Sequence, residues 1–289
     1  MSSKLSGNKL LHLEMPTWLR GSSFENTVRA LGVKVKLVSR KIEKGLRGGK
    51  VRAKLPSTEI ELWLDYDFAI KVPLPHNDEM LSAFVSSLEP GNIVYDVGSF
   101  VGWYSIAALK RIGPEGRVYS FEPVPETAKW LRRHIELNQG ESHVRVIEAA
   151  CGHEFQLISM PVRSNGLASG NGLFDVHPRA DIPPTNIEVC MIPLDEFWQT
   201  SNLPPDVIKI DVEGAEMWVL KGAQKILSTI RPTVFLEIHK FAWDFFNTTN
   251  EELLDFLSLV SYDILDITYP HKWITDLPER GFVILKPIE

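Results

Sequence analysis

Residues 92–103 read Asn-Ile-Val-Tyr-Asp-Val-Gly-Ser-Phe-Val-Gly-Trp, and this stretch decides the fold of the chain. An apolar strand that runs into a glycine loop and then into a helix is the first unit of a doubly wound α/β fold. Gly98 and Gly102 let the loop turn tightly onto the helix N-terminus and let the backbone come close to a ligand. We therefore predict a strand over 92–97, a ligand-binding loop and a helix over 103–111.

The spacing of the glycines indicates which ligand this loop binds. A dinucleotide site reads G-x-G-x-x-G, whereas this chain has Asp96-x-Gly98-x-x-x-Gly102 and no third glycine at the required step. The spacing therefore disfavours a nicotinamide dehydrogenase. Asp96 would repel a pyrophosphate, but its charge suits a ligand that carries a sulfonium cation. We predict an S-adenosylmethionine site that includes Asp96, Gly98, Ser99 and Gly102.

A second acidic residue ends the next predicted strand, at 117–121. Glu122 follows Asp96 by 26 residues, a distance at which a carboxylate at the strand tip can accept hydrogen bonds from both hydroxyls of a ribose. The next helix begins near Pro123 and runs to about residue 138. We predict that Glu122 and Pro123 belong to the cofactor site; the alternative for Glu122 taken singly is a solvated strand end.

Two further predicted strands, at 207–210 and 234–238, end in ionisable side chains. These side chains are Asp211, Glu213, Glu237 and His239. In an open parallel sheet, ligands bind outside the carboxyl ends of the strands. We therefore expect the four side chains to face the crevice that also receives Asp96 and Glu122. We also predict that Asp211 belongs to the cofactor site, where its carboxylate would lie near the cationic cofactor.

The same four side chains are candidates for catalysis. His239 is a candidate general base because its unperturbed pKa lies near neutrality, and Asp211 is another because it ends a strand at the crevice. A divalent cation held by the four is an alternative that is not favoured, because no spacing in the sequence specifies its ligand cage. Glu213 could instead cap a helix predicted over 214–228, and Glu216 is interpreted as a structural residue of that helix.

The C-terminal part predicts one helix and a pair of strands. The helix over 250–259 begins with a capping box formed by Thr249 and Glu252. The strands predicted at 262–267 and 281–286 are joined by a segment too short for a crossover helix, so they must be antiparallel neighbours. The predicted fold class is α/β, with a Rossmann-like, mostly parallel sheet of seven strands that a C-terminal antiparallel hairpin completes.

The most specific motif lies at 206–216 and reads Asp-Val-Ile-Lys-Ile-Asp-Val-Glu-Gly-Ala-Glu. Further blocks occur in order at 94–104, 121–126, 194–197 and 236–239. Together these blocks resemble the FkbM family of S-adenosylmethionine-dependent methyltransferases, over about residues 60–289. The resemblance implies a class I methyltransferase sheet and methyl transfer, most often to a hydroxyl, which we expect on a small molecule or sugar. Family members usually have Ala-Asn where this chain has Ser99-Phe100.

Charge is divided unevenly along the chain. Residues 1–54 carry 13 Lys and Arg but only 3 Asp and Glu, whereas the remaining residues carry 18 and 34. This acidity argues against nucleic-acid binding by the main domain, because phosphate binding is driven by clustered cations. An RNA methyltransferase guided by the basic arm is one alternative function, and a nonenzymatic S-adenosylmethionine-binding domain is another.

An amphipathic helix is predicted within the basic arm. Its apolar residues recur at spacings of three and four over residues 24–42. We interpret it as a helix that packs on the main domain or on a second subunit, which would make a homodimer; the alternative is a surface for an anionic partner. With a hairpin of 50–55 and 58–72, the arm forms a predicted N-terminal domain, 1–75, followed by the methyltransferase domain, 76–289.

The cysteines and the apolar runs bear on where the protein is found. Cys151 and Cys190 cannot form a disulfide framework and lack the spacing of a zinc site, which indicates a reducing compartment. We find neither a secretory signal nor an uncharged apolar run of about 18 residues. We therefore expect a soluble cytoplasmic protein without a transmembrane segment.

A long segment, 151–205, separates two of the predicted strands and contains a polar, glycine-rich stretch at 164–172. Stretches of this kind inside a domain are often lids or acceptor-binding loops. The alternative is a disordered surface insertion.

Overall fold

The computed structural model describes residues 44–45, 48–70, 72, 74, 79–163, 183–267, 274 and 277–288. The chain divides into two compact units, Met1–Gly49 and Lys50–Glu289. The amphipathic helix predicted at 24–42 lies outside the described residues, and so does the glycine-rich stretch at 164–172. A homodimer through that helix therefore stays a prediction, and the description below concerns the second unit.

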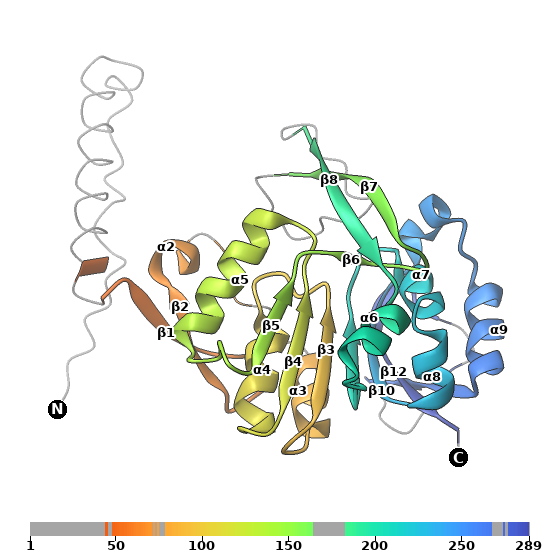
Figure 1. The fold of residues 1–289 in the computed structure, drawn as a ribbon, viewed down its shortest axis with the longest axis horizontal. Helices are drawn as coiled ribbons and strands as arrows, with labels where there is room; N and C mark the ends of the chain where they lie inside the picture. Colours follow the sequence, from red (N-terminus) through yellow and green to blue (C-terminus); the bar gives the residue numbers. More distant parts are fainter. Residues whose placement is uncertain are drawn as a thin grey trace, which may run out of the picture. The chain divides into compact units, whose positions relative to one another are not determined.

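A seven-stranded sheet forms the centre of the second unit (Figure 1). Its strands, in spatial order, are β11 (Tyr262–Asp266), β12 (Arg280–Pro287), β10 (Thr233–His239), β9 (Val207–Ile210), β3 (Ile93–Val97), β4 (Arg117–Phe121) and β5 (Val144–Ile147). The five strands from β10 to β5 are parallel, and β12 is antiparallel to both of its neighbours. The predicted sheet with its C-terminal antiparallel hairpin is confirmed, and this is the class I methyltransferase arrangement.

Side chains alternate between two hydrophobic cores, one on each face of the sheet. Tyr95 and Tyr119 point into one core, whereas Val94 and Val118, their neighbours along β3 and β4, point into the other. This alternation follows from the two-residue period of a strand. Helices α6 (Leu194–Ser201), α7 (Glu216–Lys221), α8 (Gln224–Thr229) and α9 (Asn250–Val260) cover the first face, and α3 (Glu79–Ser87), α4 (Trp103–Ile112) and α5 (Pro125–Leu137) cover the second.

The N-terminal hairpin packs on this second face. It consists of β1 (Lys50–Lys54) and β2 (Glu61–Asp65), and the backbone N–H of Trp63 donates to Asn138 Oδ1 at the end of α5. The prediction of a strand that extends to residue 72 is wrong. The side chain of Asp65 accepts a hydrogen bond from the N–H of Asp67 and so caps a short helix, α2 (Tyr66–Ala69).

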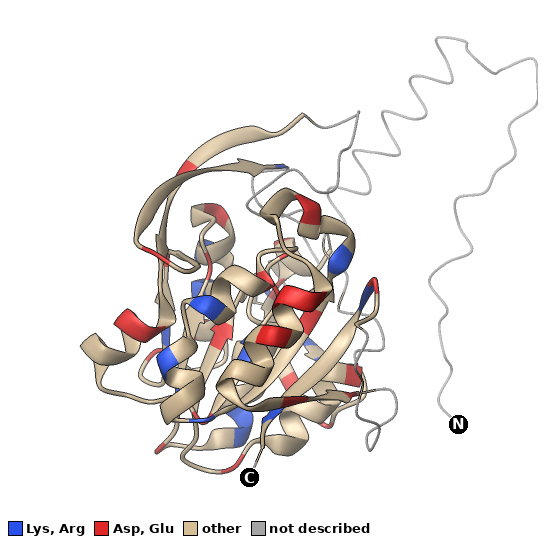
Figure 2. Cartoon of the chain, turned by 90° about the vertical axis from the view of Figure 1, so that its right-hand side faces the viewer, with Lys and Arg blue, Asp and Glu red and all other residues tan. Residues whose placement is uncertain are grey.

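The long segment after residue 151 contributes to a second, smaller sheet. Its strands are β6 (Ala150–Cys151), β8 (Thr185–Ile192) and β7 (Gln156–Val162). Figure 1 draws β7 and β8 above the carboxyl ends of β3, β4 and β5, and the same pair forms a curved ribbon at the top of Figure 2. Met160 and Met191 of this sheet share a third apolar cluster with Ala215 and Ala242, which follow β9 and β10. The small sheet therefore adjoins the edge at which ligands are expected.

Local capping explains how the helices after β9 begin and end. The helix predicted over 214–228 is interrupted, because the carboxylate of Asp195 accepts from the N–H groups of Lys225 and Ile226 and starts α8 anew. The predicted capping residue Thr249 is confirmed, since its hydroxyl accepts from the N–H of Glu252. No helix in the described part of the chain has both the length and the apolar character that a bilayer span requires.

Candidate functional site

The loop after β3 crosses from its own strand to the tip of β4. The N–H groups of Gly98 and Ser99 both donate to the carbonyl of Phe121, each at 3.0 Å. Gly98 has a φ of 73°. A Cβ on this residue would lie 1.8 Å from the carbonyl oxygen of Asp211. A glycine is therefore required here because the loop packs against the backbone that follows β9, a reason that the sequence analysis did not foresee.

Glu122, at the tip of β4, holds the same loop through backbone contacts. Its Oε2 accepts from the N–H of Phe100 at 2.9 Å, and its Oε1 accepts from the N–H of Val124 at 2.9 Å. Burial raises the pKa of Glu122 to about 8, although the two N–H groups oppose that rise. Each oxygen retains a second lone pair that can accept a further hydrogen bond.

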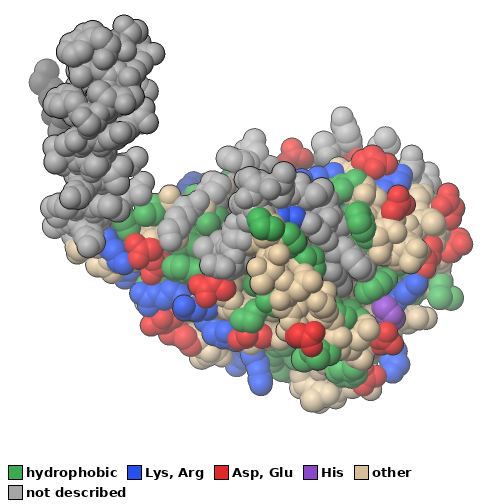
Figure 3. Space-filling view, turned by 90° about the horizontal axis from the view of Figure 1, so that it is seen from above, with side chains coloured by type: hydrophobic (Ala, Val, Ile, Leu, Met, Phe, Trp, Pro, Cys, Tyr) green, Lys and Arg blue, Asp and Glu red, His purple; other side chains and the backbone are tan. Residues whose placement is uncertain are grey.

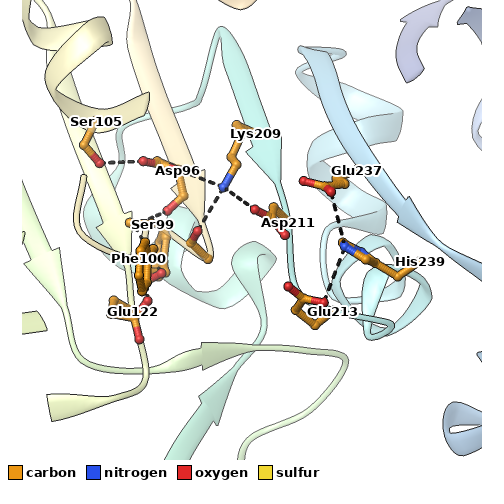
Figure 4. A network of polar contacts seen from close by, with 12 residues as sticks. Asp96, Ser99, Phe100, Ser105, Glu122, Lys209, Asp211, Glu213, Glu237 and His239 are labelled. Carbon is orange, nitrogen blue, oxygen red and sulfur yellow. Dashed lines mark hydrogen bonds and ion pairs between the residues drawn. The ribbon is translucent and has the colours of Figure 1, made fainter. Parts of the chain in front are cut away.

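A buried lysine joins the ends of β3 and β9 (Figure 4). The ammonium of Lys209 donates to the carbonyl of Gly98 at 2.9 Å and lies 3.5 Å from both Asp96 Oδ1 and Asp211 Oδ2. Ser105 Oγ donates to the other oxygen of Asp96 at 2.5 Å. Asp96 has no exposed surface, and burial raises the pKa of its carboxyl against the effect of Lys209. The carboxylate of Asp96 therefore points into the protein. It supports the loop indirectly, through Lys209, which donates to the Gly98 carbonyl.

His239 ends β10 within a group of carboxylates. Its Nδ1 lies 2.9 Å from Glu216 Oε1, and its Nε2 lies 3.5 Å from Glu213 Oε2 and 3.4 Å from Glu237 Oε1. Burial lowers the pKa of His239, but the carboxylates, Asp211 among them, outweigh burial and raise it to about 11. This environment moves the pKa of His239 away from the unperturbed value that made it a candidate general base. The surrounding carboxylates favour a proton on the ring, and this disfavours His239 as the general base.

Glu216 holds the ring of His239 in place through its contact with Nδ1. It is fully buried, its Oε1 accepts from the N–H of Gly214 at 2.9 Å, and its Oε2 accepts from Trp243 Nε1 at 2.7 Å. The interpretation of Glu216 as a structural residue is correct, but its contact with His239 places it directly against the candidate catalytic group. Glu213 has a φ of 53° and precedes α7 in a loop.

Comparison with known proteins agrees with this geometry. The sequence model of one protein family, described as the methyltransferase FkbM domain, matches residues 96–264 of this chain, which is more than half of its length. The chain belongs to the FkbM methyltransferase family. The matched region contains every residue that we predicted for the cofactor and catalytic sites of this FkbM chain.

Individual relatives of the FkbM chain are distant. The hexuronic acid methyltransferase AglP of Haloferax volcanii is 26% identical over 162 residues, which cover 56% of this chain and 62% of AglP. Methyltransferase 1 of Beauveria bassiana is 29% identical over 153 residues, which cover 48% of this chain and 61% of that protein. The chain thus spans less than two-thirds of the length of these curated relatives. The crystal structure of methyltransferase FkbM from Methylobacillus flagellatus KT aligns with a TM-score of 0.40 at 18% identity, over 69% of this chain and 44% of that one.

The FkbM fold brings the predicted catalytic residues together. Candidate ligand atoms of Asp211, Glu237 and His239 all lie within 4.8 Å of one another. Asp211 and Glu213 are the more open members, with 30% and 14% of their side chains exposed. Figure 4 shows Glu213 and Glu237 on either side of the His239 ring. The four side chains therefore lie close together at the ends of β9 and β10.

The predicted cofactor residues of the FkbM domain divide into two groups. Glu122 and the partly exposed Pro123 lie at the tip of β4, beside the loop that follows β3. Asp96 and Ser99 are turned inward, since Ser99 Oγ donates to the carbonyl of Asp96 at 2.7 Å. Gly102 has a φ of 96° and is the residue at which α4 begins. The inward group thus shapes the loop, whereas the first group has atoms that can contact a ligand.

Sequence reasoning missed two polar residues of the FkbM site, Lys209 and Ser105. A signal for Lys209 was available, because it is a cation within an otherwise apolar, fully buried strand, Val-Ile-Lys-Ile. Charged residues are rarely buried unless they are paired. Ser105 gave no comparable signal, since a serine within a helix is ordinary.

Proposed function

We propose that this chain transfers a methyl group from S-adenosylmethionine to a hydroxyl of a small molecule or sugar. The observation that carries the proposal is the pairing of two features at one edge of the sheet: Glu122 beside the loop after β3, and the ionisable cluster at the ends of β9 and β10. Membership of the FkbM family supports methyl transfer. The relative AglP, a hexuronic acid methyltransferase, supports a sugar acid as the first acceptor class to test.

The residues that would hold the cofactor fit its chemistry. Glu122 has lone pairs for the ribose hydroxyls, and the loop over 98–102 is shaped by Asp96, Lys209 and its own glycines. The bound cofactor supplies a sulfonium whose methyl group is already electrophilic. The protein therefore mainly has to orient the acceptor, and to take its proton.

The proton of the acceptor hydroxyl passes to a carboxylate of the cluster in this mechanism. The carboxylates favour a protonated His239, so the candidates are Asp211 and Glu213, whose side chains are the most exposed of the cluster. His239, which is held by Glu216, keeps their negative charges close together.

The first test is ligand binding. We expect S-adenosylmethionine and S-adenosylhomocysteine to raise the unfolding temperature of the full chain, and NAD to leave it unchanged. Ligand at about 100 times its dissociation constant adds about 2.7 kcal/mol to the free energy of unfolding. The absence of a shift with both adenosyl ligands would remove the proposed function.

Substitution of Asp211 tests the catalytic cluster. We expect Asp211→Asn to lower kcat by about 10²- to 10⁴-fold, because an amide cannot accept the proton of the acceptor hydroxyl. The measurement is S-adenosylhomocysteine formation at saturating cofactor with a panel of hexuronic acid glycosides. The matched control is Asp263→Asn, an exposed carboxylate on β11. An unchanged kcat in Asp211→Asn would exclude this residue from the reaction.

Cofactor affinity should depend on pH through Glu122. The carboxylate form accepts from both ribose hydroxyls, and below its pKa of about 8 the carboxyl must release a proton when the cofactor binds. The affinity for S-adenosylhomocysteine should therefore rise about tenfold per pH unit up to pH 8 and then level off. Glu122→Gln should bind weakly and without this slope in isothermal titration. If the variant keeps the slope, another group is responsible.

The alternative of an RNA methyltransferase depends on the basic arm. Among the side chains that Figure 3 colours, Lys and Arg are interspersed with Asp and Glu. Salt-dependent RNA binding that is lost when residues 1–54 are deleted would favour this alternative over a sugar acceptor.

A further inference from the structure

We propose that Asp211, Glu237 and His239 form a binding site for a divalent metal ion of the first transition row. Such a site is not predicted by any ligand spacing in the sequence. The three residues become neighbours because β9 and β10 pair in parallel, with Ile210 opposite Leu236. Asp211 therefore lies beside Glu237. Glu237 and His239 are two residues apart on β10, so their side chains leave the same face of the strand.

The distances suit an ion. One ligand atom from each residue can be chosen so that all three lie within 4.8 Å of one another. Two ligands that bind one ion at about 2.1 Å are separated by at most about 4.2 Å. The three side chains therefore need only small adjustments to close around an ion.

The ring of His239 points its Nε2 toward this space, where the carboxylates of Glu237 and Glu213 lie 3.4 and 3.5 Å away. His239 is fully buried, and its Nε2 has no hydrogen-bond partner within the described part of the chain. Its other nitrogen, Nδ1, is held by Glu216 at 2.9 Å. A histidine that ligates a metal usually has its second nitrogen bonded to a carboxylate in this way, which fixes the orientation of the ring. Glu216 is thus a positioning residue for the ligand.

Several carboxylates gather around the ring of His239. Four carboxylates surround the ring, those of Asp211, Glu213, Glu216 and Glu237. Cations in contact with these carboxylates include Lys209, which Asp96 shares, and Arg280, whose side chain is 61% exposed. Buried charges are costly unless they are paired. A divalent cation bound at His239 Nε2 would add positive charge among these carboxylates.

The set of donor atoms favours a particular class of ion. Two carboxylates and one imidazole form a mixed oxygen and nitrogen set, which suits Mn²⁺ and its neighbours in the row, whereas Mg²⁺ and Ca²⁺ prefer oxygen alone. The role of the ion rests on the proposed function. Bound to the acceptor hydroxyl, it would lower the pKa of that group. The proton would pass to Glu213, which lies outside the ligand set, and the oxygen would bond to the methyl carbon as the carbon–sulfur bond breaks.

Titration with Mn²⁺ tests the site without any acceptor. The full chain is treated with a chelator, and free Mn²⁺ is followed by its electron paramagnetic resonance signal. We expect one ion per chain. Binding should be weakened about tenfold or more in both Asp211→Asn and Glu237→Gln. Asp263→Asn, the exposed control on β11, should bind like the unaltered chain.

Two outcomes would overturn the site. One is the absence of binding up to about 1 mM Mn²⁺, the weak end of functional divalent sites. The other is equal binding by Asp211→Asn, Glu237→Gln and the unaltered chain, which would assign the ion to surface carboxylates. Thermal shifts with S-adenosylhomocysteine on the same samples verify that the variants are folded. They also keep the two proposals separate, because cofactor binding without Mn²⁺ binding would overturn the metal site alone.

Discussion

Replacement of Lys209 by methionine is expected to lower the free energy of unfolding by about 3–5 kcal/mol, because loss of one partner leaves buried charge uncompensated. The side chains of Lys209 and Asp96 are 3% and 0% exposed. Methionine has a similar volume, so the loss should be electrostatic and should not arise from a cavity. The Gly98 carbonyl also loses its donor, which should weaken the binding of S-adenosylhomocysteine. Urea denaturation followed by circular dichroism measures the first effect, and isothermal titration measures the second.

Two further variants isolate the cause of this loss. Asp96→Asn combined with Lys209→Met should be more stable than Lys209→Met alone, because the neutral amide needs no counter-charge. Lys225→Met, at a lysine whose side chain is 61% exposed, should change stability by less than about 0.5 kcal/mol. If the double variant is no more stable than the single one, the pairing of Lys209 with Asp96 is not what stabilises this region.

Gly98→Ala is expected to be the most damaging substitution in the loop after β3. The added methyl group would lie 1.8 Å from the Asp211 carbonyl oxygen, which is a backbone atom that cannot rotate away. A φ of 73° adds the cost of a left-handed conformation, about 1–2 kcal/mol. We expect a total loss of stability above about 3 kcal/mol and no detectable binding of S-adenosylhomocysteine.

Gly91→Ala is a matched control for backbone strain. Gly91 has a φ of 87°, but a Cβ there would meet nothing within 4 Å. This variant should lose only the conformational cost of about 1–2 kcal/mol and should bind the cofactor normally. Equal losses in urea denaturation for Gly91→Ala and Gly98→Ala would mean that the contact between the loop and Asp211 is unimportant.

The elements that sequence patterns predicted well are those that depend on neighbouring residues. The strand, loop and helix around Gly98 were placed within a residue or two, since an apolar run and paired glycines are local signals. The capping role of Thr249 was found for the same reason. The break between α7 and α8 was missed because Asp195, which caps α8, lies about 30 residues earlier in the chain.

The candidate site divides in the same way. Asp211 and His239 could be identified from their positions at strand ends, because parallel strands bring their carboxyl ends to one edge. The charge of His239 could not be predicted, since it depends on carboxylates from the loop after β9, the start of α7 and β10 itself. The side chain of Asp96 points inward because it pairs with Lys209, which is 113 positions away in the sequence.

The sequence alone determined the α/β class, the strand, loop and helix around Gly98, and which ionisable residues end the parallel strands. These features follow from hydrophobic periodicity and turn residues, which act over a few positions. Only the tertiary structure decided which of those residues support the loop, which hold a charge and which could surround an ion. Hydrogen bonds and ion pairs act over about 3–4 Å, so they depend on distances between strands that sequence spacing does not encode.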